Sequence, residues 1–348
     1  MTLSNLDVAE LLARSGDEAE GHRRKAYQRA AGFALLWPEE VSDVLERGGT
    51  LTGLHGIGES LSRRISGWFE NPPGDLEAPP ARSGFSSFAR ARTIAERRPE
   101  WRSRLRSDLQ MHTHYSDGVA SVKEMALGAV ALGYEFMAVT DHSQGLAVAG
   151  GMDEARLASQ GEEVKAVNDE LSSEGSDFVV LHAIEMNLDE NGDGDMDPDS
   201  IATLDLVLGS FHSRLRAAED QTDRYLGALA NPQVQVIGHP TCRRFNRRPG
   251  LVADWGRIFA AAEKSGKALE INSHPHRQDL SAELLAEARN FDLTFSIGTD
   301  AHSPEELEFI EMSLASAIDS GIEPERIVNF WPLERVLEWA GTRREGAR

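Results

Sequence analysis

From residue 106 onward, short apolar runs alternate with longer segments in which apolar residues recur every three or four positions. Seven runs have the length and composition of strands: "SDLQM" (107–111), "EFMAVT" (135–140), "DFVVLHAIEMNL" (177–188), "DLVLGSF" (205–211), "VQVIGH" (234–239), "ALEIN" (268–272) and "LTFSIGT" (293–299). Most are separated by helical patterns such as "SVKEMALGAVALG" (121–133) and "SAELLAEARN" (281–290). Strands joined by helical crossovers are typical of parallel α/β folds. The pattern therefore predicts a parallel sheet, either closed as a barrel or open.

The first 105 residues follow a different pattern. Residues 5–70 carry apolar residues at helical spacing, with a glycine-rich turn in "LTGLHGIGESLSRRI" (51–65). Residues 71–87 are rich in Pro, Gly and Ser and predict a linker, and the basic segment 88–104 predicts an approach helix. We therefore expect a small all-α domain at 1–70, a linker with its approach helix at 71–105, and the α/β domain at 106–348.

Charge is distributed unevenly along the chain. There are 36 Lys and Arg against 57 Asp and Glu, a net charge of −21, and the first 105 residues contain 15 of each kind. All the excess acid therefore lies in the predicted α/β domain. An acidic surface attracts cations and repels polyanions, although solubility alone explains this charge equally well. Binding of a nucleic acid would require a separate basic region.

The expected location is the cytoplasm, away from a membrane. No segment approaches the ~20 apolar residues needed to span a bilayer. The N-terminus, "MTLSNLDVAELLARSG", lacks a basic-then-apolar leader. The single cysteine, Cys242, excludes an internal disulfide and is compatible with a reducing compartment.

Nearly every predicted strand carries a histidine or a carboxylate at or near its carboxyl end. These candidates are His112, His114, Asp117, His142, Glu185, His212, His239, Asp300 and His302. A single histidine is more often structural, but the carboxyl ends of parallel strands gather at one edge of the fold. Imidazole with carboxylate suits Zn, Mn or Fe, and the absence of thiolates excludes a structural zinc finger. Nine candidates are too many for one ion, so we expect two or three divalent ions.

The motifs "HTHYSDG", "TDHS", "FHS", "GHPT" and "TDAHS", with the Glu185 strand, resemble the successive motifs of the PHP (polymerase and histidinol phosphatase) family over roughly residues 106–320. The resemblance implies a distorted seven-stranded barrel with a trinuclear metal cluster that hydrolyses phosphoesters. By position it implies three ion sites: His112, His114, Glu185 and Asp300 for the first, Glu185, His212 and His239 for the second, and Asp117, His142 and His302 for the third.

Two arginines could complete this catalytic site around the bridging Glu185. Arg243 and Arg277 follow the fifth and sixth predicted strands and could bind phosphoryl oxygens, although a surface position is an equal alternative. His182 is expected to pack on the opposite face of its strand from Glu185. Asp141 is expected to support the ligands.

The segment "LTGLHGIGESLSRRI" resembles a helix-hairpin-helix, in which Gly56 and Gly58 would let the backbone approach a DNA phosphate. Arg63 and Arg64 could add contacts to the phosphate backbone without base specificity. The 5–70 segment resembles the N-terminal domain of bacterial family X DNA polymerases, which carry a PHP domain at the C-terminus. The polymerase core has no counterpart here, so polymerase activity is not expected. The alternative is that this domain packs on the barrel or on another protein.

Three hypotheses remain. The first is a metal-dependent phosphoesterase that acts on DNA ends, as a 3'–5' exonuclease or 3'-end-processing enzyme in DNA repair. The second is a small-molecule phosphatase of the histidinol-phosphatase type. The third is a non-catalytic DNA-repair accessory.

Overall fold

The computed structural model describes residues 2–74 and 76–345; Met1, Asp75 and the last three residues of the expected 106–348 domain, 346–348, lie outside the described residues. Seven parallel strands form one sheet in which spatial order follows sequence order. They are β1 (Ser107–Asp108), β2 (Phe136–Val139), β3 (Val179–Asn187), β4 (Leu206–Ser210), β5 (Val236–Ile237), β6 (Ala268–Asn272) and β7 (Thr294–Gly298).

The first and last strands meet at a seam. A parallel bridge between Met111 and Ala301, just beyond the ends of β1 and β7, closes the sheet. The amide of Leu109 also donates to the carbonyl of Ile297, and the amide of Asp300 donates to the carbonyl of Gln110. The side chain of Asn329 adds hydrogen bonds to the carbonyls of Ser107 and Ile297. The predicted distorted seven-stranded barrel is therefore confirmed.

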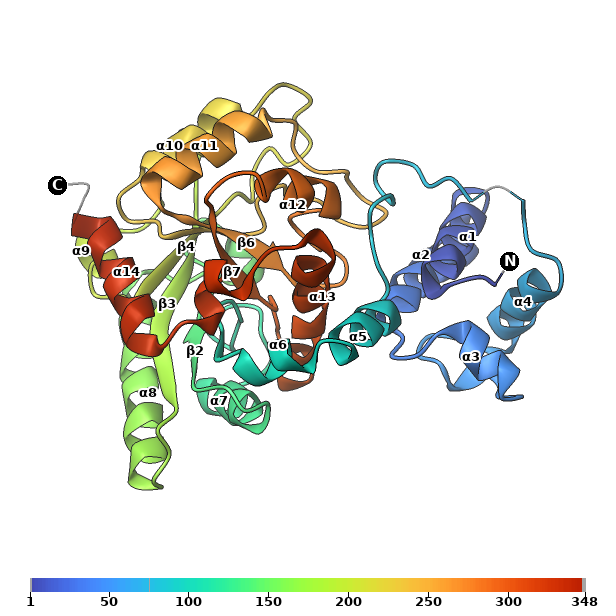
Figure 1. Ribbon diagram of the computed structural model, residues 1–348, viewed down its shortest axis with the longest axis horizontal. Coiled ribbons are helices and arrows are strands. Elements are labelled where there is room, and N and C mark those ends of the chain that lie inside the picture. Colours follow the sequence, from blue (N-terminus) through green and yellow to red (C-terminus); the bar gives the residue numbers. More distant parts are fainter. Residues whose placement is uncertain (1, 75, 346–348) are drawn as a thin grey trace.

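Helices connect the strands and surround the barrel (Figure 1). They are α7 (Val122–Ala131), α8 (Glu154–Ser173), α9 (Pro198–Ile201), α10 (Thr222–Ala230), α11 (Trp255–Ser265), α12 (Ala282–Ala288), α13 (Ile310–Ser320) and α14 (Leu333–Glu345). Ser121 begins α7 with a capping box, because its hydroxyl accepts from the amide of Glu124 while that carboxylate accepts from the amide of Ser121. Among the described helices, none combines the length and the apolar character needed to cross a bilayer.

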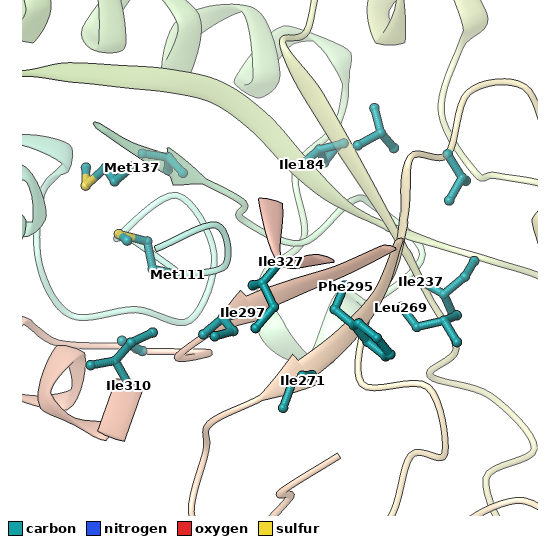
Figure 2. Close-up of a cluster of buried hydrophobic side chains, with 14 of the residues drawn as sticks. Met111, Met137, Ile184, Ile237, Leu269, Ile271, Phe295, Ile297, Ile310 and Ile327 are labelled. Atoms are coloured by element: carbon teal, nitrogen blue, oxygen red, sulfur yellow. The ribbon is translucent and has the colours of Figure 1, made fainter. Parts of the chain in front are cut away.

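Side chains on β3 alternate between the two faces of the sheet. Leu181 and Ala183 point into the barrel, where they belong to a cluster with Trp331 from the C-terminal segment. Ile184 belongs instead to the larger cluster beneath the helices. Figure 2 shows part of that cluster, with Met111, Met137, Ile184, Ile237, Leu269, Ile271, Phe295, Ile297, Ile310 and Ile327 labelled. Glu185 therefore shares the inner face with Leu181 and Ala183, closer to the carboxyl end of the strand.

The N-terminal helices form a second hydrophobic core, which also includes Phe85 of the linker and Phe245 of the loop after β5. These helices are α1 (Asn5–Asp17), α2 (Gly21–Leu36), α3 (Val41–Glu46), the 3₁₀ helix η1 (Leu51–Gly53) and α4 (Glu59–Glu70). The buried side chain of Asn5 accepts from the amide of Val41 at 2.8 Å and donates to the carbonyl of Glu39 at 2.9 Å, which fixes α1 against the start of α3.

The expected approach helix at 88–104 is divided into α5 (Phe88–Glu96) and α6 (Pro99–Arg104). Pro99 has no amide hydrogen, so it cannot continue α5 and instead occupies the first turn of α6. Phe88 and Ala91 of α5 pack against Met312 and Ala315 of α13. The segment between the two regions is therefore attached to the barrel (Figure 1).

Arg82 joins three parts of the chain. Its side chain, 9% exposed, donates to the two carboxylate oxygens of Glu10 at 2.8 and 3.2 Å and to Asp17 at 3.0 Å, both in α1. It also donates to the side-chain oxygen of Asn246, in the loop after β5, at 2.9 Å. This guanidinium therefore connects the linker, the N-terminal helices and the barrel.

Arg82→Ala is expected to lower the free energy of unfolding by about 2 kcal/mol, because it removes the more buried arginine partner of the Glu10 carboxylate, which keeps its contact with Arg14. Urea denaturation of the full chain measures this difference. Arg47→Ala removes an exposed ion pair with Glu39 and is the matched control, with an expected loss below about 1 kcal/mol. Equal losses in the two variants would contradict the role given to Arg82.

Candidate metal centre

Polar side chains converge at the carboxyl ends of the strands. Glu185, at the end of β3, is fully buried and lies at their centre. Its Oε1 is 2.8 Å from Nε2 of His239 and 3.3 Å from Nε2 of His212. Its Oε2 is 3.1 Å from Nδ1 of His142 and 3.4 Å from Nε2 of His112. One carboxylate thus contacts histidines that follow four different strands.

Two further carboxylates complete the cluster. Oδ1 of Asp300, which follows β7, lies 3.1 Å from Nε2 of His112. Oδ1 of Asp117 lies 3.3 Å from Nε2 of His302, 3.7 Å from Nε2 of His142 and 4.0 Å from Nδ1 of His112. The structure therefore brings together eight of the nine candidate ligands.

Three overlapping groups have ligand atoms within 4.8 Å of one another: His112, Asp117, His142 and His302; His142, Glu185 and His212; and His112, Glu185 and Asp300. Each group corresponds to one of the three expected ion sites. The third site gains His112, and the second site gains His142. His239 contacts Glu185 at the edge of the second group.

The buried nitrogens of this cluster fit metal ligands. Nδ1 of His112, Nδ1 of His142 and Nε2 of His212 have no hydrogen-bond partner among the described residues, although each ring lies against carboxylates. A buried polar atom without a partner costs free energy, so such atoms are rare in folded proteins. Each of these three nitrogens lies 3.1–4.0 Å from an oxygen of Glu185 or Asp117, and a cation bound between them would satisfy both atoms.

The two buried carboxylates are ionised. Burial opposes ionisation of Glu185, but the surrounding imidazoles, first among them His142, outweigh it and hold the pKa of Glu185 well below its usual value. Burial is likewise outweighed at Asp300, whose pKa is held well below its usual value by Arg277 and His112. Both groups therefore offer anionic oxygens at neutral pH.

The histidines differ in pKa. Burial lowers the pKa of His142 to about 3, although the carboxylate of Glu185 opposes this shift. Burial also acts on His302, but Asp117 and Asp300 outweigh it and raise the pKa of His302 to about 9. A metal ion at His302 would have to displace a proton from this ring.

Local backbone structure positions these groups. Asp141 is buried and accepts from the backbone amide and hydroxyl of Thr113 at 2.8 and 2.6 Å and from the side-chain amide of Gln160 at 2.6 Å, so it holds the turn after His112. His239 and Asp300 have φ values of 27° and 56°, a strained conformation for non-glycine residues that is common at functional sites. The expected supporting role of Asp141 agrees with these contacts.

His114 lies outside the cluster, contrary to the expectation that both histidines of "HTHYSDG" are ligands. Its side chain is 49% exposed, its ring lies beside Tyr115, and its nearest charged partner is Glu163 at 3.8 Å. The cause is the turn after His112, in which the amides of Ser116 and Gly118 both donate to the carbonyl of Thr113. An extended chain would point His112 and His114 to the same side, but this turn does not.

The two candidate arginines lie in different places, one at the metal centre and the other at the linker. Nε of Arg277 donates to Asp300 at 2.8 Å, and its side chain lines a cavity of about 370 Å³ over the cluster. Arg243 instead donates to the carbonyls of Ser83 and Gly84 and lies over the ring of Phe85, 3.9 Å from its centroid. The placement of Arg243 in the site was therefore wrong, because the turn at Cys242 (φ 56°) directs it toward the linker.

Sequence reasoning missed several residues of the site. Arg244 and Arg248 line the same cavity as Arg277. Glu270 is fully buried beside the cluster, where it accepts from the amide of His239 at 2.5 Å, and burial raises its pKa well above the usual value. The available signal was β-strand periodicity, since Glu270 lies two residues before Asn272, whose side chain donates to Asp300 at 3.4 Å.

The glycine-rich hairpin has contacts within its own domain. Gly56 has a φ of 79°, and a Cβ there would lie 2.2 Å from the ring of Phe33, so packing also accounts for this glycine. Gly58 precedes α4 as its N-cap. Arg64 donates to the hydroxyl of Ser15 and lies over the rings of Tyr27 and Trp68. Arg63 is exposed on α4, with its side chain 3.4 Å from the carbonyl of Glu59.

Comparison with known proteins gives three findings. Residues 108–274 match a family model described as "PHP domain". The chain is 37% identical over 233 residues to "DNA polymerase/3'-5' exonuclease PolX" of Bacillus subtilis (strain 168), which covers 67% of this chain and 40% of that protein. It is 28% identical over 203 residues to a "Probable phosphatase" of Acetivibrio thermocellus, covering 55% of this chain and 78% of that protein. The chain thus spans less than half the length of the Bacillus relative.

A solved structure also aligns with the chain. It is histidinol phosphate phosphatase from Lactococcus lactis, complexed with zinc, L-histidinol and phosphate. The TM-score is 0.40 at 15% sequence identity, over 70% of this chain and 94% of that one.

Proposed function

The chain contains a PHP domain at residues 108–274, and on this premise we propose that it is a metal-dependent phosphoesterase that shortens DNA from its 3' end. The observation that carries the proposal is the buried cluster of imidazoles and carboxylates centred on Glu185, which opens into a cavity lined by Arg244, Arg248 and Arg277. Anionic ligands below and guanidinium groups above are the arrangement that a phosphodiester and divalent cations require together.

The roles of the residues follow from their positions. Glu185 would hold two cations, because its two oxygens face different groups of histidines. Arg277 orients Asp300 and keeps it ionised. Two or three divalent ions, Zn, Mn or Fe, would lower the pKa of a water and offset charge on the phosphoryl oxygens. Arg244 and Arg248 would bind the remaining phosphate oxygens and orient the scissile bond.

DNA is the favoured substrate for two reasons. The Bacillus relative that is 37% identical is named a DNA polymerase/3'-5' exonuclease. The helical N-terminal region also adds basic side chains beside the barrel. A small-molecule phosphatase of the histidinol-phosphatase type is the second candidate, because the cavity of about 370 Å³ falls within the size range of small-ligand pockets. The phosphatase name of the Acetivibrio relative agrees with that alternative.

Manganese-loaded protein is expected to convert 5'-labelled single-stranded DNA into a ladder of shorter labelled products. Histidinol phosphate is expected to be hydrolysed with a kcat/KM at least about 10²-fold lower, since it lacks the strand that the basic side chains would bind. Gel analysis and phosphate release measure the two reactions, with His112→Ala as the inactive variant. Phosphate release from histidinol phosphate without any shortening of DNA would contradict the proposal and support the phosphatase alternative.

A further inference from the structure

A second cavity, of about 870 Å³, lies between α2 and the mouth of the barrel. One wall carries Lys25 and Arg29 of α2, and the other carries Arg216, Arg244 and Arg247 of the barrel loops. We call this cavity the interdomain cleft. Figure 1 shows the N-terminal helices beside the loops of the barrel that contribute the second wall.

The five cations of the interdomain cleft are not neutralised by the protein. Within the described residues, none of them forms an ion pair with a carboxylate, although the chain carries a net charge of −21. By contrast, the nearby Arg214 forms ion pairs with both Glu190 and Glu219. Burial and the neighbouring Arg277 and Arg247 lower the pKa of Arg244 to about 10. Like charges held together in this way favour an anion between them.

The walls of the interdomain cleft are fixed relative to each other. Nε2 of His276, in the loop after β6, lies 3.1 Å from the carbonyl of Gly32 in α2. The amide of Phe245 donates to the carbonyl of His276 at 2.8 Å, which joins the loops after β5 and β6. Arg82 adds its buried contacts to Glu10 and Asn246. A bound polyanion would therefore meet two walls whose relative position is already fixed, which lowers the cost of binding.

The interdomain cleft leads to the metal centre. Arg244 lines both this cleft and the cavity over Asp300 and His302. The size of the cleft suits a few nucleotides of one strand but not an enclosed duplex. The half-buried ring of Phe33 and the ring of His276 offer flat surfaces on which bases can stack, a common feature of single-strand binding sites.

We propose that the interdomain cleft binds the backbone of single-stranded nucleic acid and delivers its terminal phosphodiester, past Arg244, to the metal centre. This inference rests on the proposed function and adds the path of the substrate. It also assigns strand binding to α2 and the loop after β5 rather than to the glycine-rich hairpin. Phosphate contacts of this kind carry no base specificity.

The test is binding of a fluorescein-labelled oligothymidylate of about twelve nucleotides with phosphorothioate linkages, which keep the charge and resist hydrolysis. Fluorescence anisotropy of the full metal-loaded chain is measured between about 50 and 200 mM salt. The variant is Lys25→Ser/Arg29→Ser/Arg247→Ser, in which all three side chains are exposed. The matched control, Arg47→Ser/Arg98→Ser/Arg257→Ser, removes the same charge from arginines that pair with carboxylates elsewhere.

The cleft variant is expected to bind about 10²-fold more weakly near 0.1 M salt, with a salt dependence reduced by about two logarithmic units per decade, since each lost phosphate contact removes ~0.7. The control triple variant is expected to change affinity by less than about threefold. An equal loss of affinity for the oligothymidylate in both triple variants would overturn the inference. A loss of affinity in Arg63→Ser that is larger than the loss in the cleft variant would also overturn it. Because binding is measured without turnover, failure of the cleft is distinguishable from failure of the proposed hydrolysis, which the DNA-shortening assay measures separately.

Discussion

Glu185→Gln is expected to lower kcat/KM for DNA shortening by at least about 10³-fold. This effect exceeds the roughly 10- to 100-fold decrease that is typical when a residue that only hydrogen-bonds to a metal ligand is replaced. Glutamine keeps the shape of the side chain but removes the negative charge that faces four imidazoles. The variant is also expected to lose bound metal, because a neutral amide cannot bridge two cations as a carboxylate does. Gel-based kinetics and elemental analysis of the purified protein measure the two effects.

His114→Ala is the matched control for this experiment, because His114 belongs to the same motif as His112 but points away from the cluster. It is expected to retain metal content and activity, whereas His112→Ala is expected to lose both. Activity and metal retained in Glu185→Gln would refute the bridging role of this carboxylate. Loss of metal in His114→Ala would instead support the expectation that both histidines of "HTHYSDG" bind metal.

Metal loading is expected to raise the free energy of unfolding by about 4 kcal/mol when the free ion is ~1,000 times its Kd. For a protein of this size, that corresponds to an increase in Tm of about 6 °C. The physical reason is that the cluster holds ionised Glu185 and Asp300 in a buried environment with unpartnered imidazole nitrogens. Differential scanning calorimetry of chelator-treated and metal-loaded protein measures the shift.

The same calorimetry on two variants shows where the stabilising ions bind. His114→Ala should keep the full increase in Tm, and Glu185→Gln should lose most of it. An identical Tm with and without metal in the unaltered protein would mean that the cluster binds no ion tightly. An undiminished shift in Glu185→Gln would place the stabilising ions elsewhere in the chain.

The parallel arrangement of the strands was predictable because buried strands and amphipathic helices leave clear periodic patterns, whereas closure into a barrel was implied only by the resemblance of the motifs to the PHP family. Strand alternation also placed His182 correctly, on the face opposite Glu185, where its ring packs against Gly161 of α8. The same alternation would have identified Glu270, which shares a face of β6 with Asn272. These features depend only on regular backbone geometry, which short-range sequence determines.

The errors came from irregular segments and from contacts between distant parts of the chain. The direction of His114 depends on the hydrogen bonds of a turn, which the spacing of two histidines does not reveal. Arg243 and Arg244 are adjacent and chemically alike, yet one contacts the linker and the other lines the metal site. The turn at Cys242 and the position of the linker against the barrel distinguish them, and the position of the linker depends on long-range packing.

Because the metal centre lies beside the seam between β1 and β7, a bound ion would also affect the closure of the barrel. The described contacts across it include the Met111–Ala301 bridge and the amide groups of Asn329, while His112 and Asp300 stand beside the bridge on opposite sides. A cation shared by these two ligands would link the first and last strands of the barrel. Loss of this ion would weaken the closure between the first and last strands, so the same ion would support both hydrolysis and the stability of the barrel.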